Sequence, residues 1–281
     1  MKTAVLITPN HPEDSSGAVA AAASVARESG WELVADSEEH RKHGDAAAEI
    51  ATVEELPRDP ELCLVLGGDG SILYALRRYA STEVPVFGIN FGTIGFLAAM
   101  EREQLEDGLR RAFSGEFEVM SLPGLEVGMD LPDRVGLNDI AFMRQPQGRV
   151  AELSYAIADQ EVGHVRCDGL VAATPAGSTG YNLANAGPIL AWGVEGYVVS
   201  FIAPHTLTAR ALVVAPDDTL TVRNAAGREP VEIELDGERC GQLEPGAEVE
   251  VRFRQDLGRI AQLEGANFYQ RIREKFGRLA Q

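Results

Sequence analysis

The chain has 281 residues, 45% of them hydrophobic, which is enough for one large domain or two ordinary ones. Its formal net charge of −18 disfavours phosphate backbones and anionic headgroups, so we expect neither nucleic acid nor a membrane as a partner. The three cysteines, Cys63, Cys167 and Cys240, lie far apart and fit neither a disulfide framework nor a CxxC metal pair. Such cysteine usage is expected of a protein in a reducing cytoplasm. We expect no segment to span a bilayer, and the apolar run at residues 4–7 is too short for a signal peptide.

Strand-like and helix-like segments alternate along the first part of the chain. Strands are expected at residues 3–8, 32–35, 62–66 and 84–89, and helices at residues 16–29, 71–79 and 101–113. This alternation predicts an α/β domain with a parallel sheet. In such sheets, ligands bind beyond the carboxyl ends of the strands.

From about residue 116 the pattern changes to short β-branched or alternating runs separated by Gly, Pro and Asp. Strands are expected at residues 125–129, 137–143, 153–158, 197–202, 211–214, 219–223, 231–235 and 248–253. These runs predict a β-rich second domain. Helical spacing returns at residues 267–279, where Phe268, Ile272, Phe276 and Leu279 share one face, so this segment is expected to pack on the first domain.

A glycine-rich loop follows the apolar run at residues 62–66. The loop reads Gly67, Gly68, Asp69, Gly70 and Ser71. Its glycines let backbone N–H groups approach an anion, and the following helix would direct its positive end at a phosphate. A carboxylate is unfavourable there unless a metal or a substrate hydroxyl must also be held, so Asp69 indicates phosphoryl transfer.

Other familiar site patterns are excluded. None of the three lysines follows a glycine, which rules out a Walker A loop. Leu73 takes the place of the third glycine of a dinucleotide fingerprint, and Asp69 would oppose a pyrophosphate. The chain has no HRD or DFG kinase set and no HExxH or spaced Cys/His zinc site. His40 and His43 could share one face of a helix, and we expect that face to be solvated.

One long segment is almost free of charge. Between Gly169 and Ala209, Glu195 is the only Asp, Glu, Lys or Arg in a chain that is 24% charged. Residues 174–182 within it are rich in small hydrogen-bonding groups, which suits recognition of a nucleoside or amide. A buried core or subunit interface with turns would have the same composition.

A hydrolase site built on Ser178, His205 and Asp168 is disfavoured. Gly177 stands directly before the serine, so the segment misses the GxSxG pattern of a nucleophile elbow.

Several motifs, in order, resemble those of NAD kinases over about residues 62–238. They are the loop at residues 67–71, Gly88 to Leu97, Leu137-Asn138-Asp139, Asp168-Gly169-Leu170, residues 174–182 and Gly187-Pro188-Ile189, with weaker matches at residues 204–207 and 236–238. A GGDG loop alone also occurs in diacylglycerol kinases, sphingosine kinases and phosphofructokinases. The ordered series is far more specific.

The resemblance implies a Rossmann-like α/β domain at residues 1–116, completed by residues 262–281, and a C-terminal β-sandwich at residues 117–261 that binds NAD. It implies transfer of the terminal phosphoryl group of ATP, or of polyphosphate in some members, to the 2′-hydroxyl of the adenosine ribose of NAD. The product would be NADP. The reaction would use the divalent metal Mg²⁺, and the protein would assemble as a homodimer or homotetramer.

The resemblance also assigns roles to single residues. Asp69 would accept the hydroxyl proton or hold Mg²⁺, and the amides of Gly67, Gly68 and Gly70 would receive phosphate oxygens. The segment that cradles adenine and ribose matches Thr179, Gly180, Tyr181, Asn182, Leu183 and Ala184.

Further contacts to the dinucleotide are implied for four residues. Asn138 and Asp139 match the family's Asn-Glu pair, although aspartate is one methylene shorter and its reach is therefore in question. Asp168 matches a carboxylate used on NAD, and Arg166 is expected to meet a phosphate. Alone, Asn138-Asp139 is also typical of a β-turn and Asp168-Gly169 of a hairpin turn.

Two other functions stay open at this point. A kinase with a lipid or sugar acceptor could share the glycine loop. A non-catalytic dinucleotide sensor could explain Ser71, Asp139 and Gly180, which depart from the family's usual residues.

Overall fold

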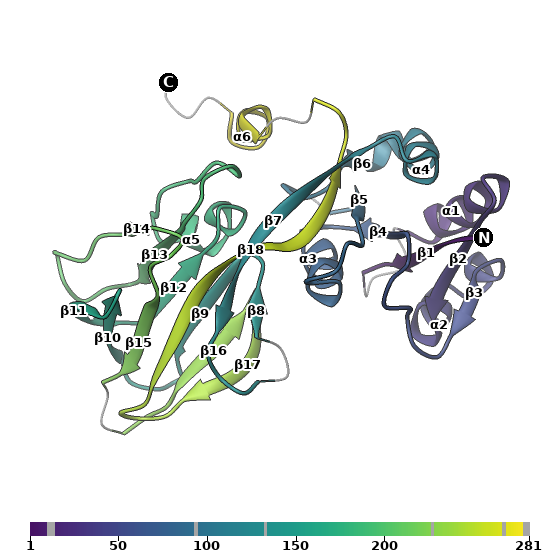
Figure 1. Ribbon diagram of the computed structural model, residues 1–281. Coiled ribbons are helices and arrows are strands. Elements are labelled where there is room, and N and C mark those ends of the chain that lie inside the picture. The colour runs from purple at the N-terminus through teal and green to yellow at the C-terminus, as the bar shows by residue number, and fades with distance from the viewer. Residues whose placement is uncertain (10–14, 93–94, 132–133, 226–227, 266–267, 278–281) are drawn as a thin grey trace. The chain divides into compact units, whose positions relative to one another are not determined.

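The computed structural model describes residues 1–9, 15–92, 95–131, 134–225, 228–265 and 268–277 (Figure 1). The chain forms two compact units, Met1–Ser121 with Gly258–Gln281 and Leu122–Leu257. Thr93 and Ile94 of the predicted motif, and Asn267 and Leu279 of the predicted last helix, lie outside the described residues. None of the helices in the described ranges is long and apolar enough to cross a membrane.

The first unit is built on a parallel sheet with the strand order β5-β4-β1-β2-β3. Its strands are β1 (Lys2–Ile7), β2 (Trp31–Asp36), β3 (Ala51–Val53), β4 (Leu62–Gly67) and β5 (Val86–Asn90). All six residues of β4 are buried, because helices cover both faces of a parallel sheet. Two further strands pair with β5: the short β6 (Met100–Glu101) and the end of β18 (Glu248–Gln262), where Ile260 faces Val86.

Helices connect and flank these strands. They are α1 (Ser16–Glu28), α2 (Ser37–His43), α3 (Asp69–Arg78), α4 (Leu105–Ser114) and α6 (Phe268–Phe276), with 3₁₀ turns at Gly44–Ala47 and Arg102–Gln104. One apolar cluster joins α1 and α4 to Leu64 and Leu66 of β4. The last helix belongs to the same unit, since the rings of Phe96 and Phe276 lie 5.5 Å apart.

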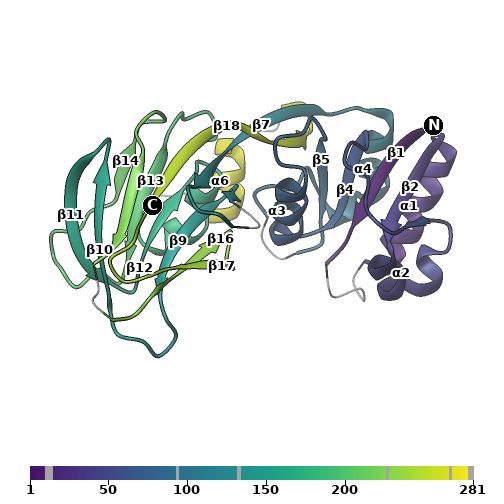
Figure 2. The ribbon, with the colours of Figure 1, turned by 60° about the horizontal axis from the view of Figure 1, so that its bottom comes forward.

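The second unit is a sandwich of two antiparallel sheets (Figure 2). One sheet has the order β14-β13-β12-β9-β16-β17, with the bounds β9 (Asp139–Arg144), β12 (Gly169–Ala173), β13 (Tyr197–Ile202), β14 (Leu212–Val214), β16 (Val231–Leu235) and β17 (Glu238–Leu243). The other contains β7 (Glu118–Val127), β8 (Val135–Gly136), β10 (Ala151–Ile157), β11 (Gln160–Cys167), β15 (Leu220–Asn224) and part of β18. Both sheets contribute to one apolar core, as shown by Phe142 and Val222.

The predicted fold class, an α/β domain followed by a β-sandwich, is confirmed. Eight helices and strands of the described ranges were not predicted: α2, β3, β6, β8, β11, β12, α5 (Tyr181–Ala184) and β17. Helix α2 reads SEEHRKH and has no apolar period, while β11 is exposed over most of its length and β12 is buried throughout. A strand is recognised most easily when one face is buried and the other exposed, and neither β11 nor β12 meets that condition.

We predict that Leu64→Ala lowers the free energy of unfolding by about 2–5 kcal/mol, because it leaves a cavity at a fully buried position of β4. Tyr74→Ala, on the exposed side of α3 in the same unit, should cost about 0.5 kcal/mol. Urea titration followed by circular dichroism measures both. Equal losses in the two variants would contradict the assigned core.

Candidate active site

The glycine loop sits at the junction between β4 and α3. Strand β4 ends at Gly67, Gly68 is the N-cap, and the helix begins at Asp69. The N–H groups of Ser71 and Ile72 donate to the carbonyl of Gly68 at 3.0 and 3.1 Å, which closes the first turn. The loop therefore lies at the carboxyl end of a parallel strand and at the positive end of a helix, as predicted for an anion site.

The Asp69 carboxylate is held by the backbone of a second segment. Its Oδ2 accepts a hydrogen bond from the N–H of Phe96 at 2.8 Å, and its Oδ1 accepts one from the N–H of Leu97 at 3.1 Å. The Arg271 guanidinium of α6 donates to the carbonyls of Phe96 and Ala98 at 2.5 and 2.7 Å. Residues far apart in sequence thus fix the orientation of one carboxylate.

The environment of Asp69 changes its basicity. Burial raises the pKa of the Asp69 carboxyl, whereas the two backbone N–H bonds and the positive charges of Arg271 and Lys275 lower it. The net shift is upward. A carboxylate with a raised pKa accepts a proton more readily, which is the property required of a general base.

Residues of the neighbouring segment pack closely on this loop. Asn90 faces Gly67 across β5 and β4, and its side chain accepts from the N–H of Gly92 at 2.9 Å and donates to Glu101 at 2.7 Å. A Cβ on Gly95 would lie 3.2 Å from Asp69 Oδ1. Neither Asn90 nor Gly95 was among the predicted site residues, although both lie in the motif that runs from Gly88 to Leu97.

In the second unit, Asn138 and Asp139 stand at the start of β9. Asp139 is only 5% exposed, and no described residue donates a hydrogen bond to its carboxylate. Among the same residues, the buried Oδ1 of Asn138 also lacks a hydrogen-bond partner. Burial and the neighbouring charges of Asp236 and Glu234 raise the pKa of Asp139 to about 7. Two adjacent polar side chains therefore have unused hydrogen-bonding capacity.

The uncharged segment after β12 uses most of its small polar groups internally. Thr174 Oγ1 donates to the carbonyl of Leu137 at 2.7 Å, and Ser178 Oγ donates to that of Pro175 at 2.7 Å. Asn182 Nδ2 donates to the carbonyls of Ser178 and Pro188 at 3.0 Å each. The alternative of a buried core with turns thus explains Thr174 and Ser178, whereas the buried Oδ1 of Asn182 has no hydrogen-bond partner among the described residues. A buried, hydrogen-bonded Ser178 also argues against a hydrolase nucleophile.

Part of that segment lies beside Asn138 and Asp139. A Cβ on Gly177 would meet the carbonyl oxygen of Asn138 at 1.9 Å, so the two backbones are in direct contact. Tyr181 opens the short helix α5 (Tyr181–Ala184), which holds Leu183 and Ala184 as well. Burial raises the pKa of Tyr181, and the nearby charges of Glu234, Asp139 and Asp168 raise it further. Thr179 and Gly180 complete the turn before α5.

Asp168 and Arg166 form ion pairs near a basic pocket. Asp168 connects β11 to β12, which lie in different sheets, so the hairpin-turn alternative is wrong. Its Oδ1 accepts from Arg144 Nε at 2.7 Å, and Arg166 Nε lies 3.3 Å from Glu152. A pocket of about 550 Å³ is lined by four arginines, namely Arg144, Arg149, Arg166 and Arg228, together with neutral residues and the acidic Glu152 and Glu229.

The expectation that His40 and His43 face solvent is wrong for His43. Its side chain is buried, with Nε2 lying 2.7 Å from Thr8 Oγ1 and Nδ1 lying 3.1 Å from Ser16 Oγ. The polar residues Thr8, Ser16 and Glu39 provide partners that the local sequence did not reveal.

Comparison with protein families matches both units. Residues 16–117 match the model of the ATP-NAD kinase N-terminal domain, and residues 137–256 match that of the ATP-NAD kinase C-terminal domain. The NAD kinase of Rhodopirellula baltica is 36% identical over 225 residues, which cover 78% of this chain and 72% of that protein. The NAD kinase of Carboxydothermus hydrogenoformans is 33% identical over 232 residues, covering 81% and 83%.

Two solved structures share the fold. Yeast NADH kinase complexed with NADH superposes with a TM-score of 0.86 at 19% identity, covering 100% of this chain and 89% of that one. An NAD kinase from Archaeoglobus fulgidus in complex with ATP has a TM-score of 0.75 at 23% identity, covering 99% and 98%.

We predict opposite effects for two glycines of the loop. In Gly67→Ala, the new Cβ would lie 2.7 Å from Ser71 Oγ and 2.8 Å from Ser71 Cβ, which should cost about 1–3 kcal/mol of stability. In Gly70→Ala, the new Cβ meets open space in the first turn of α3, and stability should rise by roughly 0.5–1 kcal/mol. Thermal unfolding of the two variants should separate them, and a melting temperature for Gly67→Ala at or above that of Gly70→Ala would refute the close approach.

Proposed function

The chain belongs to the NAD kinase family, and we propose that it transfers the terminal phosphoryl group of ATP to the 2′-hydroxyl of the adenosine ribose of NAD, giving NADP. The observation that carries the proposal is the Asp69 carboxylate at the start of α3, which is oriented by the backbone N–H groups of Phe96 and Leu97. Enzymes with a lipid or sugar acceptor and non-catalytic sensors are disfavoured, since the family match extends over both units.

The glycine loop is assigned to binding the phosphates of ATP. We assign the backbone amides of Gly67, Gly68 and Gly70 to oxygens of the ATP phosphates. Gly70 supports this assignment, since it is exposed and a Cβ there would meet nothing within 4 Å. The helix macrodipole of α3 adds favourable charge for an anion at the same end.

Asp69 serves as the general base in this proposal. It accepts the proton of the ribose 2′-hydroxyl while that oxygen bonds to the terminal phosphorus and the bond from phosphorus to the leaving oxygen of ADP breaks. An ionised carboxylate has about four acceptor positions, and the bonds from Phe96 and Leu97 use two of them. The remainder suffices for the substrate hydroxyl.

A divalent metal, Mg²⁺, fits this site as a partner of the ATP phosphates. No group of three or more His, Cys, Asp and Glu side chains that could hold a metal occurs in the described ranges. Mg²⁺ commonly uses one or two carboxylates together with substrate phosphates, so Asp69 alone is compatible with it. When bound, the metal would neutralise phosphate charge.

The dinucleotide is assigned to residues of the second unit. Asn138 Oδ1, which has no hydrogen-bond partner among the described residues, and the buried Asp139 carboxylate offer acceptors for ribose hydroxyls or amide groups. Arg166, at the arginine-lined pocket, offers a charge for a phosphate, and Asp168 a further acceptor. Adenine and ribose are assigned to Thr179, Gly180, Tyr181, Asn182, Leu183 and Ala184. The Asn182 side-chain Nδ2 is engaged internally, whereas its Oδ1 has no hydrogen-bond partner among the described residues.

We extend the proposal to three properties that the family resemblance implies. Polyphosphate is an alternative donor to ATP, the assembly is a homodimer or homotetramer, and the enzyme works in the cytoplasm. The three cysteines in the described ranges are free thiols, which agrees with a reducing compartment.

Asp69→Asn should lower the turnover of NADP formation by about 10²–10⁴-fold, because the amide cannot accept the hydroxyl proton. Asp45→Asn, in a 3₁₀ turn of the same unit, is the matched control and should retain wild-type turnover. The rate of NADP formation, read by an enzyme that reduces NADP but not NAD, measures both. Substantial turnover in Asp69→Asn with an unchanged melting temperature would remove Asp69 from the catalytic role.

A donor panel tests the reaction itself. We expect purified protein with Mg²⁺ and NAD to form NADP when ATP is supplied, and to stop forming it when EDTA removes the metal. The panel includes polyphosphate and both low and high salt. The proposed function fails if no NADP forms with either donor at any salt concentration.

A further inference from the structure

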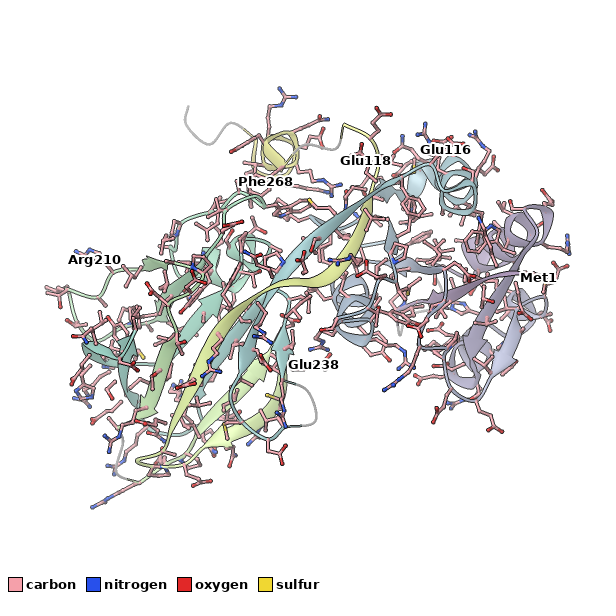
Figure 3. The ribbon with its side chains drawn as sticks, viewed as in Figure 1. Met1, Glu116, Glu118, Arg210, Glu238 and Phe268 are labelled. Atoms are coloured by element: carbon pink, nitrogen blue, oxygen red, sulfur yellow. The ribbon has the colours of Figure 1, made fainter. Side chains whose placement is uncertain are left out.

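Asp236 and Gly237 form the tight turn between β16 and β17, and the next residue, Glu238, is labelled in Figure 3. The Asp236 carboxylate accepts three backbone hydrogen bonds from a distant segment: from the N–H of Leu137 at 3.0 Å, of Asn138 at 2.7 Å and of Asp139 at 3.0 Å. Its own N–H donates to the carbonyl of Asp139 at 3.0 Å. Four hydrogen bonds therefore connect one turn to three consecutive residues.

The same three residues are also held from the opposite direction. The N–H of Thr174 donates to the carbonyl of Asn138 at 2.8 Å, and its Oγ1 donates to that of Leu137. Gly177 touches the Asn138 carbonyl so closely that no side chain would fit there. The main chain of Asn138 is thus fully engaged, whereas its side-chain Oδ1 has no partner among the described residues.

The negative charge of Asp236 interacts unfavourably with the acidic residues around it. The charges of Asp236 and of Glu234 in β16 raise the pKa of the buried Asp139, and the charges of Asp139 and Glu234 in turn raise the pKa of Tyr181. Like charges disfavour ionisation of a buried carboxyl, and no basic group among the described residues offsets this effect on the pKa of Asp139. A carboxylate suits this position because its two oxygens accept hydrogen bonds from three N–H groups. The single oxygen of an amide could not reach all three equally well.

We propose that Asp236 is a positioning residue for dinucleotide binding, which fixes the backbone at Leu137, Asn138 and Asp139 so that the Asn138 and Asp139 side chains are presented to NAD. This inference rests on the proposed function. Asp236 touches no substrate in this account and acts only through the two residues that it orients.

The test compares Asp236→Asn with Asp159→Asn. Asp159 lies in the turn between β10 and β11 with φ of 62°, and Asp236 has φ of 49°, so the control matches the turn and the charge change. The dissociation constant of NAD is measured by titration calorimetry between pH 5.5 and 8.5. The KM for ATP and the melting temperature are measured alongside it.

We expect Asp236→Asn to weaken NAD binding by about tenfold. This corresponds to roughly 1.4 kcal/mol, which is the size of effect expected when one charge-assisted hydrogen bond is lost. The KM for ATP should change less than about twofold. Removing the charge of Asp236 lowers the pKa of Asp139, so the pH below which NAD affinity declines should move downward from about 7. Asp159→Asn should match the wild type in affinity and in pH dependence.

Unchanged NAD affinity and an unmoved pH profile in Asp236→Asn, with only a lower melting temperature, would reduce Asp236 to a structural turn residue and overturn the inference. An equal loss of NAD and ATP affinity would do so as well. Wild-type protein that binds NAD but forms no NADP would overturn the proposed reaction instead, and the calorimetric comparison would still decide the role of Asp236.

Discussion

The carboxylate of Asp69 accepts hydrogen bonds from the N–H groups of Phe96 and Leu97, and these bonds join the end of β4 to the segment that follows β5. Much of the first unit supports this contact. Asn90 and Gly95 fit closely around it, and α6 reaches the same segment through Arg271. The constraint places a partly desolvated carboxylate beside backbone amides at a helix start, where a phosphate and a hydroxyl can meet.

In the second unit, a different set of hydrogen bonds holds the polar residues Asn138 and Asp139 in place. The main-chain N–H groups of Asn138 and Asp139 donate to Asp236, while the side-chain Oδ1 of Asn138 has no hydrogen-bond partner among the described residues. Leaving a buried carboxylate without donors costs free energy, which a ligand that supplies hydrogen bonds would recover. In both units, backbone hydrogen bonds over long sequence distances hold a carboxylate ready for a substrate.

The fold class and most of the candidate site could be predicted from sequence, because glycines, apolar periods and ordered motifs are local signals. Among the elements that were missed, α2 is polar throughout and has no apolar period; its start is marked by Asp36, whose side chain accepts hydrogen bonds from the N–H groups of Glu38 and Glu39. The contacts of His43 with Thr8 and of Asp236 with Asn138 join residues 35 and 98 positions apart, so tertiary structure alone reveals them. The sequence shows Asp139 in place of the family's glutamate, but it does not reveal that this carboxyl is buried and has a raised pKa.

The proposed reaction phosphorylates one particular hydroxyl of NAD, the 2′-hydroxyl of the adenosine ribose. The most direct measurement is ³¹P NMR of the product formed from ATP and NAD, followed by enzymatic cleavage of its pyrophosphate. We expect one new monoester phosphate, found on the 2′-oxygen of the adenosine fragment. A phosphate on the nicotinamide ribose, on the adenosine 3′-oxygen, or on no fragment of the dinucleotide would contradict it.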